Sequence, residues 1–395
     1  MLTDKGPTVL HFVGSGWDVG GTLSYIRSVT RQNGARNILI VQEGFEQTRH
    51  PHMKLLRISK GDYSRLLSPM AIWDSLKQVA WLRRKLVRRH NLIFHGHSRG
   101  GVLLGIILSL LGHQRVVVTV HLNNPQRWFY RLGHAVMRDR MIFLCPSMKR
   151  YYGLPAENWR DCIPGSVPPS LRRPGKTIPP FFGPETERTL TIGGCGIIVD
   201  WKRWEIILEA LGWLPTEIRR RVKFIHIGDP LDENISQDYS QLLRDLVHEH
   251  HLHEIVEWRG HQNDVKAFFS EIDLLVHPAE NEPFGLAVVE SLFAGVPVIA
   301  SDTVGAADLF APPENGLKFP TNNSRALATM IAELIEGKRA FPQVNRRSLR
   351  PLEPDYLNAR WAEIYLKLFE DNDIRATRTR YGGEGYSLGN STRTR

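Results

Sequence analysis

Short apolar runs alternate along this chain with longer stretches in which apolar residues recur every three or four positions. Runs of the first kind predict buried β-strands, and stretches of the second kind predict helices. In the first half, helices are predicted from Gly21, over Ala71–His90 and over Gly101–Leu111. The strands predicted there are Val9–Val13, Asn37–Val41, Leu55–Ile58, Leu92–His95, Val116–Val120 and Met141–Leu144. Strands that alternate with helices are typical of a largely parallel sheet covered on both faces.

This alternation stops in residues 164–187, which hold seven prolines, and then starts again. Proline fixes the backbone and lacks the N–H of a strand interior, so the segment is predicted to be a linker. The elements predicted after it are strands Leu190–Gly193, Lys223–Ile227, Ile255–Trp258, Leu274–Val276 and Val298–Ala300, and helices from Arg203, Ser240–His250, Leu286–Ala294 and Asp355–Phe369. We therefore expect α/β domains at residues 1–165 and 188–352, a linker at 166–187 and a last helix within 353–370.

Three further features concern the environment of the chain. The tail, residues 371–395, has few large apolar residues, so we expect it to be disordered. The apolar run Gly101–Gly112 is shorter than the about 20 residues that span a bilayer, and the N-terminus shows no secretory pattern. The three cysteines, Cys145, Cys162 and Cys195, have neither a disulfide nor a zinc-site spacing. Together these features predict a cytoplasmic protein.

Charge divides the chain unequally. The net charge is +10, yet residues 1–180 hold 27 Lys and Arg against 9 Asp and Glu, whereas the remainder holds 24 against 32. Such asymmetry indicates that the first half faces an anionic partner. The anionic partner could be nucleic acid, an anionic membrane surface or a phosphate-bearing substrate.

The segment His277–Ser291 carries the clearest candidate chemistry. A predicted strand ends near His277, a loop carries Glu282, and Gly285 opens a helix that bears Glu290. Unpaired amides at a helix start favour an anion such as diphosphate, and a carboxylate accepts hydrogen bonds from ribose or sugar hydroxyls. The alternative is a solvated loop acid and a helix acid that only complements the helix dipole.

This segment resembles the E-x7-E signature of the retaining GT-B glycosyltransferases of family 4. Glu282 and Glu290 match the two glutamates, and residues 283–285 match the Pro-Phe-Gly core after the first. Residues 294–302 and the triplet Asn315-Gly316-Leu317 match the family segments that follow, in the family's order. Between them the turn departs from the family, because Val304 and Asp308 replace its usual glycine and glutamate.

The resemblance implies a role for each matching residue. Glu290 would hold the donor ribose, and Glu282 would lie against the transferred sugar as a catalytic residue. Phe284, Gly285 and Leu286 would offer backbone amides to the sugar and diphosphate.

Two other segments extend the implied donor site. Lys202, which we count as catalytic, matches the family lysine that neutralises the diphosphate, whereas Ile197 stands where the family has arginine. Loss of that cation would weaken diphosphate binding. Gly20 and Gly21 match a glycine pair at which the backbone approaches the diphosphate. The alternatives are an exposed lysine at a helix start and a tight strand-to-helix turn.

Histidines at two predicted strand ends complete the candidates. His121 resembles a family residue that contacts the donor sugar or acceptor, and we count it as catalytic. His97 lies on the acceptor or sugar side, although a buried structural histidine is the alternative reading. The resemblance implies that no metal and no cofactor beyond the nucleoside-diphosphate sugar are needed.

A basic amphipathic helix is predicted around Ser75–His90, with Trp73 and Trp81 beside its cations. Such a helix binds anionic bilayers, although a solvated face explains the pattern equally well. The sequence contains no recognised nucleic-acid module, so we expect no nucleic-acid partner.

The resemblance implies a GT-B fold, in which two Rossmann-like domains face each other across a cleft and the last helix returns to the first. We expect retaining transfer of a hexosyl group to an acceptor hydroxyl, with the leaving diphosphate assisting deprotonation and no protein nucleophile. The acceptor would be a lipid-linked or cell-envelope glycan at the inner face of the membrane. The alternatives are a non-catalytic nucleotide- or glycan-binding relative and a nucleotide-sugar epimerase of the same fold.

Overall fold

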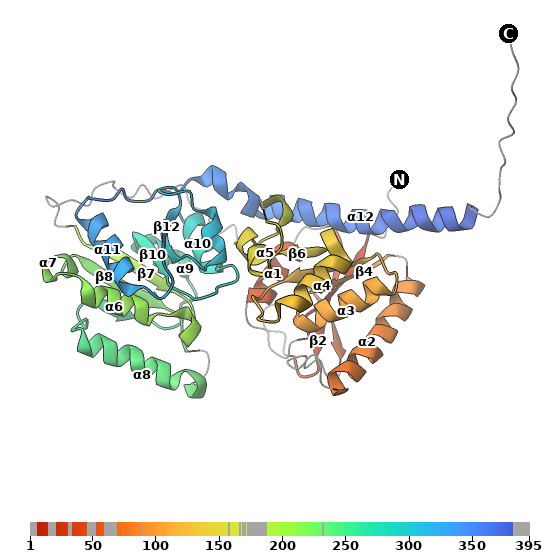
Figure 1. Ribbon diagram of the computed structural model, residues 1–395, viewed down its shortest axis with the longest axis horizontal. Helices are drawn as coiled ribbons and strands as arrows, with labels where there is room; N and C mark the ends of the chain where they lie inside the picture. The colour runs from red at the N-terminus through yellow and green to blue at the C-terminus, as the bar shows by residue number, and fades with distance from the viewer. Residues whose placement is uncertain are drawn as a thin grey trace, which may run out of the picture.

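The computed structural model describes residues 6–14, 21–30, 34–45, 53–58, 69–89, 91–156, 159–165, 167, 171, 188–230 and 233–381, which form two lobes (Figure 1). Each lobe is built around one six-stranded parallel sheet. The predicted two-domain α/β architecture is confirmed. The predicted linker, residues 166–187, lies outside the described residues except for Val167 and Leu171.

The first sheet has the strand order β3-β2-β1-β4-β5-β6. Its strands are β1 (Thr8–Phe12), β2 (Arg36–Gln42), β3 (Lys54–Ile58), β4 (Leu92–Gly96), β5 (Val116–Val120) and β6 (Met141–Phe143). The valine-rich β5 is buried along its whole length, as expected of a strand covered on both faces. The covering helices are α1 (Gly21–Thr30), α2 (Pro69–Arg88), α3 (Arg99–Leu110), α4 (Arg127–Met137) and α5 (Pro146–Tyr151).

The second sheet repeats this topology in the order β12-β11-β10-β7-β8-β9. Its strands are β7 (Leu190–Cys195), β8 (Val222–Ile227), β9 (Val256–Trp258), β10 (Leu274–His277), β11 (Val298–Ser301) and β12 (Gly316–Phe319). The helices are α6 (Glu205–Trp213), α7 (Thr216–Arg219), α8 (Glu233–Glu249), α9 (Val265–Glu271), α10 (Leu286–Phe293) and α11 (Ser324–Ile335). Every predicted strand is present in the two sheets. The additional elements, which the sequence pattern did not predict, are β12, α4, α5, α7, α9 and α11.

The two sheets share one functional property. In each, the strand order reverses between a pair of central strands, β1 and β4 in the first and β7 and β10 in the second. Loops diverge at such a switch point, and ligands bind there, beyond the carboxyl ends of the strands. The fold therefore marks two strand ends in each domain as the place to look for a site.

The last helix, α12 (Pro354–Tyr381), leaves the second domain and runs along the first (Figure 1). It packs against α1 and β4, where Trp361 and Tyr365 are fully buried. The last helix therefore lies against the first domain. The helix extends beyond the predicted end at residue 370, to Tyr381. Residues 382–395 of the predicted disordered tail lie outside the described residues.

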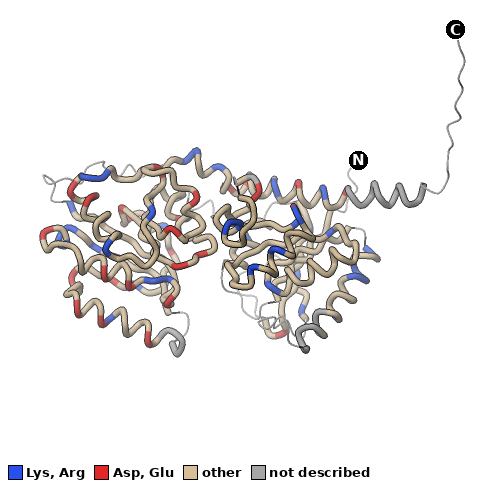
Figure 2. Tube along the Cα trace, in the orientation of Figure 1, with Lys and Arg blue, Asp and Glu red and all other residues tan. Residues whose placement is uncertain are grey.

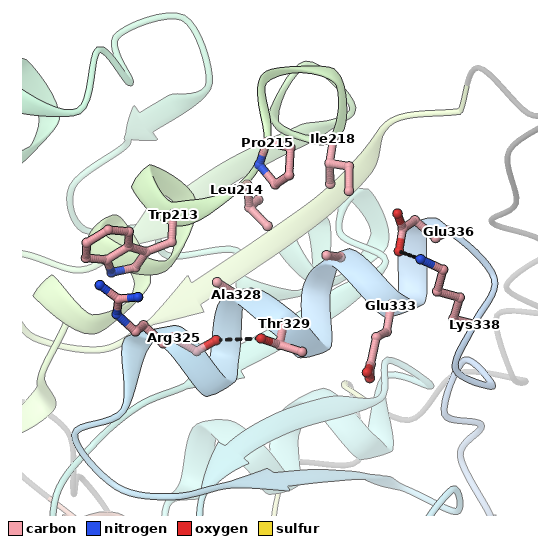
Figure 3. A pocket seen from close by; sticks show the side chains of 11 residues that line it. Trp213, Leu214, Pro215, Ile218, Arg325, Ala328, Thr329, Glu333, Glu336 and Lys338 are labelled. Carbon is pink, nitrogen blue, oxygen red and sulfur yellow. Dashed lines mark hydrogen bonds and ion pairs between the residues drawn. The ribbon is translucent and has the colours of Figure 1, made fainter.

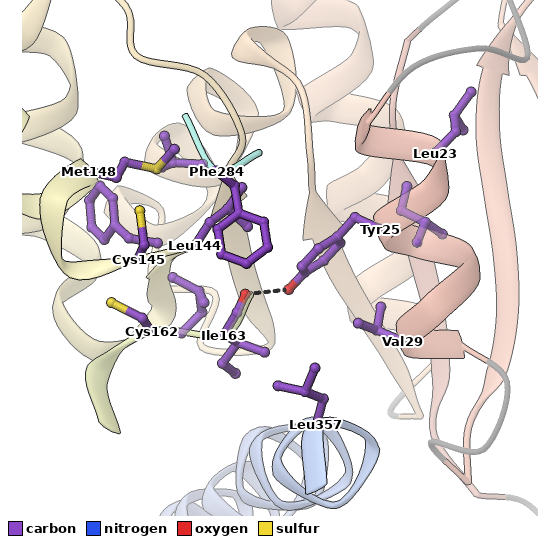
Figure 4. Packing of buried hydrophobic residues seen from close by; sticks show 14 of the residues in the cluster. Leu23, Tyr25, Val29, Leu144, Cys145, Met148, Cys162, Ile163, Phe284 and Leu357 are labelled. Carbon is purple, nitrogen blue, oxygen red and sulfur yellow. Dashed lines mark hydrogen bonds between the residues drawn. The ribbon is translucent and has the colours of Figure 1, made fainter. Parts of the chain in front are cut away.

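The domains also share apolar packing. Figure 4 shows the ring of Phe284, from the second domain, among side chains of the first that include Leu144 and Cys145. Polar contacts flank this packing: Asp308 accepts hydrogen bonds from the Ser147 amide and the Arg150 guanidinium, both at 2.6 Å. The loops beyond the two sheets therefore meet at the domain boundary.

Charge follows the two domains. Figure 2 shows Lys and Arg spread over the first domain, where α2 and the α4–α5 region carry several of them, while Asp and Glu gather on the second. Among the described helices, none is long and apolar enough to cross a membrane.

Candidate active site

Glu282 and Lys202 form the centre of the candidate site in the second domain. Glu282 lies on the loop after β10, and Lys202 lies in a short 3-10 helix, Asp200–Lys202, after β7. The Lys202 ammonium donates to a Glu282 carboxylate oxygen at 2.5 Å, and both side chains are about 15% exposed. The two residues are 80 positions apart and meet at the switch point of the sheet.

The ionisation of Glu282 is set by its neighbours. Burial alone would raise the pKa of its carboxyl, but Lys202 and the neighbouring His277 together outweigh burial and hold the pKa well below the usual range. The buried His277 lies 3.7 Å away, too far for a hydrogen bond. Burial also lowers the pKa of His277. The site therefore presents a carboxylate and an ammonium at neutral pH.

The loop that holds Glu282 is fixed by its backbone. Gly285 has φ +91°, a conformation that favours glycine, and it caps the start of α10. The amides of Gly305 and Ala306 donate to the carbonyls of Glu282 and Phe284 at 3.0 and 2.6 Å. The first amides of α10 have no acceptor within their helix and remain suited to an anion.

Glu290 lies on α10 in a different environment from Glu282. Its side chain is half-buried, and its carboxyl group forms no hydrogen bond or ion pair with the residues that the structure describes. Burial raises the pKa of its carboxyl to about 7. The carboxyl group of Glu290 is therefore left available for a hydrogen bond with a partner beyond the described residues.

The other predicted donor residues lie in different surroundings. Phe284 points its ring into the domain boundary, so only its backbone is available to a ligand. Gly21 begins α1 with open space where a side chain would be, and Gly20 lies outside the described residues. Ile197 is 36% exposed, so the position of the family arginine faces solvent in this chain.

The first domain brings together four buried histidines at its own switch point. His11 lies on β1, His95 on β4 and His97 just after it, and His121 follows β5. His97 contacts His11 at 2.9 Å and His121 at 3.1 Å through ring nitrogens. The sequence analysis selected His97 and His121 but missed His11 and His95. Their position on neighbouring strands of a parallel sheet was the signal that could have found them.

Three of these histidines also have the spacing of a metal site. Ring nitrogens of His11, His95 and His97 lie within 4.8 Å of one another. His95, however, already contacts the hydroxyls of Tyr365 and Thr119, both at 2.8 Å. Both ring nitrogens of His11 and of His97 also have hydrogen-bond partners. The geometry is that of a hydrogen-bonded cluster.

The two halves of the candidate site approach each other at the domain boundary. Asn123, two residues after His121, points its side-chain amide at the carbonyl of Asn281, 3.5 Å away. Asn281 directly precedes Glu282. The loops that carry His121 and Glu282 are therefore neighbours, as a site shared by two domains requires.

A separate groove lies between α6, α7 and α11, and Figure 3 shows its lining. Arg325 stacks on the ring of Trp213 there, 4.0 Å from its centroid. None of the sequence-predicted site residues lines this groove.

Residues 183–348 match the family model of glycosyl transferases group 1. The match covers the second domain, including Lys202, Glu282 and Glu290. The chain is 38% identical to a GDP-mannose-dependent alpha-mannosyltransferase of Mycolicibacterium smegmatis over 84 residues. Those residues make up 21% of this chain and 22% of that protein. It is 28% identical over 224 residues, 55% of this chain, to an exopolysaccharide phosphotransferase of Streptomyces coelicolor. The chain spans less than a quarter of the length of either relative.

The whole chain resembles solved structures in fold. Anabaena HepE, in complex with UDP, superposes with a TM-score of 0.67 at 19% identity, covering 90% of this chain and 99% of that one. The predicted GT-B fold is confirmed by this likeness and by the two parallel sheets.

Proposed function

We propose that this protein is a retaining glycosyltransferase that moves a hexosyl group from a nucleoside-diphosphate sugar to an acceptor hydroxyl. One observation carries the proposal: the Lys202–Glu282 pair and the unsatisfied Glu290 flank the start of α10 within the segment that matches the glycosyltransferase family. This arrangement offers an ammonium and helix amides to a diphosphate, and carboxyl groups to hydroxyls.

The residues supply positioning and charge rather than a covalent intermediate. In the proposed step, the bond from the anomeric carbon to the diphosphate breaks as the bond to the acceptor oxygen forms on the same face. The acceptor proton passes to a diphosphate oxygen. Lys202 would stabilise the negative charge that develops on the leaving group, Glu290 would hold the ribose, and Glu282 would orient the sugar.

The donor class has support beyond the site itself. Structures of HepE contain UDP and UDP-glucose, and the mycobacterial relative is named for GDP-mannose.

The decisive experiment incubates the protein with UDP-, GDP- and ADP-sugars and a panel of glycan acceptors, and follows nucleotide release. A new glycoside with the donor's anomeric configuration supports the proposal, and an inverted one refutes retention. An epimerised nucleotide sugar would establish the epimerase alternative instead. Transfer that persists in EDTA would support our further proposal that no metal ion is required.

We also propose that the acceptor is held at an anionic membrane surface. On α2, Trp73, Leu76 and Val87 are more than half exposed, beside exposed cations that include Arg83 and Arg84. Apolar and basic side chains on one helix suit a lipid surface, where each cation adds about 1 kcal/mol.

The membrane proposal is tested by co-sedimentation with vesicles. The wild type should bind vesicles that contain anionic lipid and not neutral ones, and Arg83→Glu/Arg84→Glu should lower that binding. The matched control is Arg346→Glu/Arg347→Glu, which reverses two exposed cations of the second domain and should leave binding unchanged. Equal losses in both variants, or no binding by the wild type, would refute the proposal.

A further inference from the structure

Three histidines of the first domain form a chain of hydrogen bonds that begins at Asn37. The side-chain oxygen of Asn37 lies 2.9 Å from Nε2 of His11, and Nδ1 of His11 lies 2.9 Å from Nε2 of His97. Nδ1 of His97 then lies 3.1 Å from Nε2 of His121. In each of the three contacts, the Nε2 of a histidine faces the preceding member of the chain: the Oδ1 of Asn37 or the Nδ1 of a histidine.

The direction of this chain is fixed at Asn37. Its side-chain nitrogen donates to the carbonyls of Thr30 at 3.3 Å and Ala35 at 3.1 Å. Because carbonyl oxygens only accept, the amide nitrogen must face them, and the amide oxygen must face His11. The amide orientation thus follows from two backbone groups on the far side of the residue.

The proton positions of the three histidines follow from that oxygen. The rings are neutral at pH 7, because burial lowers the pKa of His11 to about 4, of His97 well below its usual value, and of His121 to about 3. A neutral imidazole has one N–H. His11 must donate from Nε2 to Asn37, so its Nδ1 accepts from Nε2–H of His97. Nδ1 of His97 in turn accepts from Nε2–H of His121, which leaves Nδ1 of His121 unprotonated.

That last nitrogen is placed where a substrate is expected. Among the residues that the structure describes, none hydrogen-bonds Nδ1 of His121, and the residue is 9% exposed. His121 follows the carboxyl end of β5, and its loop contacts the loop of Glu282 through Asn123 and Asn281. An unprotonated ring nitrogen accepts a hydrogen bond from a hydroxyl, which every sugar substrate carries.

We propose that Asn37 is a positioning residue that acts through His11 and His97 to hold His121 as the Nε2–H tautomer, with Nδ1 free to accept a hydrogen bond from a sugar hydroxyl. The identity of the ligand rests on the proposed function, whereas the tautomer rests on the hydrogen bonds and on the burial that keeps the rings neutral. Asn37 itself contacts no substrate in this assignment, and β2, which carries it, lies one strand beyond the switch point.

The tautomer is tested directly by NMR of protein labelled with 15N in its histidines. A protonated and an unprotonated ring nitrogen have well-separated 15N shifts, and the His121 signals are assigned from their loss in His121→Gln. The wild type should show His121 protonated at Nε2 alone. Protonation at Nδ1 in the wild type would overturn the proposal without any variant, as would signals that shift on metal removal because the histidines hold an ion.

Variants of Asn37 test the relay. Asn37→Leu removes the oxygen, so His121 should shift toward the other tautomer, and kcat should fall about tenfold with the donor KM unchanged. The matched control is Tyr365→Phe, which removes a hydrogen bond from His95 in the same cluster but outside the relay. An unchanged His121 spectrum in Asn37→Leu, or an equal change in Tyr365→Phe, would refute the relay.

The two proposals fail separately. Absence of sugar transfer in the wild type would refute the proposed function and leave the NMR assignment standing. An active enzyme whose His121 carries its proton on Nδ1 would refute the relay and leave the function standing.

Discussion

The two domains share one topology but build their switch points from opposite chemistry. In the second domain the candidate groups carry charge or titrate near neutrality: Lys202 pairs with Glu282, and Glu290 has a pKa of about 7. In the first domain the corresponding groups are neutral histidines, bonded to each other and buried. The contrast runs against overall composition, because the first domain is the strongly basic one (Figure 2).

This difference teaches where each kind of charge is used. Described cations of the first domain such as Arg83 and Arg84 are exposed on α2, whereas burial keeps His11 and His121 at its switch point neutral. A diphosphate would therefore be held by the second domain, and the first would offer hydrogen bonds to neutral hydroxyls. Substitutions in the second domain should change nucleotide affinity, and those in the histidine relay should change turnover.

The largest effect is expected from Lys202→Ala. This change leaves the Glu282 carboxylate without its partner, so the free energy of unfolding should fall by about 3 kcal/mol. Nucleotide affinity should fall as well, because the diphosphate loses a cation. The control is Lys223→Ala, which breaks the ion pair between Lys223 and Glu257. Both side chains of that pair are about 40% exposed, so the free energy of unfolding should fall by less than about 1 kcal/mol. Urea denaturation measures both, and equal losses would show that the Lys202 pair is an ordinary surface contact.

The next effect separates stability from binding at Glu290. Its pKa is raised in the folded state, so the folded protein holds this proton more tightly than the unfolded chain. That contribution to stability is present at low pH and is lost as pH rises through about 7. Glu290→Gln should therefore be more stable than the wild type at pH 8, by about 1–2 kcal/mol, and not at pH 4.

Binding should change in the opposite direction. The wild type should bind nucleotide more tightly as pH rises from 6 to 8, because the charged carboxylate is the better acceptor for ribose hydroxyls. Glu290→Gln should bind weakly at every pH. Thermal denaturation across this pH range measures the stability, and titration calorimetry measures the nucleotide affinity. A wild type whose nucleotide affinity does not change with pH would contradict the raised pKa of Glu290.

A smaller gain is expected from Ile197→Arg. The side chain of Ile197 is 36% exposed, so an arginine fits without displacing the core. A second cation at the diphosphate should tighten nucleotide binding about tenfold, because a charge-assisted hydrogen bond contributes about 1.5 kcal/mol or more. An unchanged affinity would mean that the diphosphate does not approach residue 197. The neighbouring Gly196 has φ +153°, a backbone conformation that side chains rarely adopt, so Gly196 is kept and only residue 197 is changed.

The smallest effect concerns the contact between the domains. Arg150 is 53% exposed where it pairs with Asp308, so Arg150→Ala should lower the free energy of unfolding by less than about 1 kcal/mol. Asp308→Ala should cost more, because the Ser147 amide loses its acceptor as well. If the two variants are equally destabilised in urea, the amide contact contributes nothing.

The two domains also differ in how much of each the sequence predicted. Strands such as β5 were predictable because a fully buried strand is a continuous apolar run. β12 was missed because it has four residues, of which Lys318 is exposed, and so it gives no such run. The Glu282 and Glu290 region was found because one short segment contains both glutamates and the glycine that opens α10.

The histidine relay could be predicted only in part. His97 and His121 stand at strand ends, but His11 and Asn37 lie within strands, where an apolar sequence pattern does not reveal a polar contact. Their hydrogen bonds depend on the lateral order β2-β1-β4-β5, which is a property of the folded sheet. The ion pair between Lys202 and Glu282 is similar, since it joins loops 80 residues apart.

The central claim is that the second domain binds a nucleoside diphosphate through Glu290, and titration calorimetry tests it most directly. UDP, GDP and ADP are titrated into the wild type and into Glu290→Ala, with Glu249→Ala, an exposed glutamate at the end of α8, as the control. We predict that one nucleotide binds the wild type and the control equally and loses its affinity in Glu290→Ala. Binding that survives in Glu290→Ala, or no binding of any nucleotide to the wild type, would contradict the assignment of the donor site.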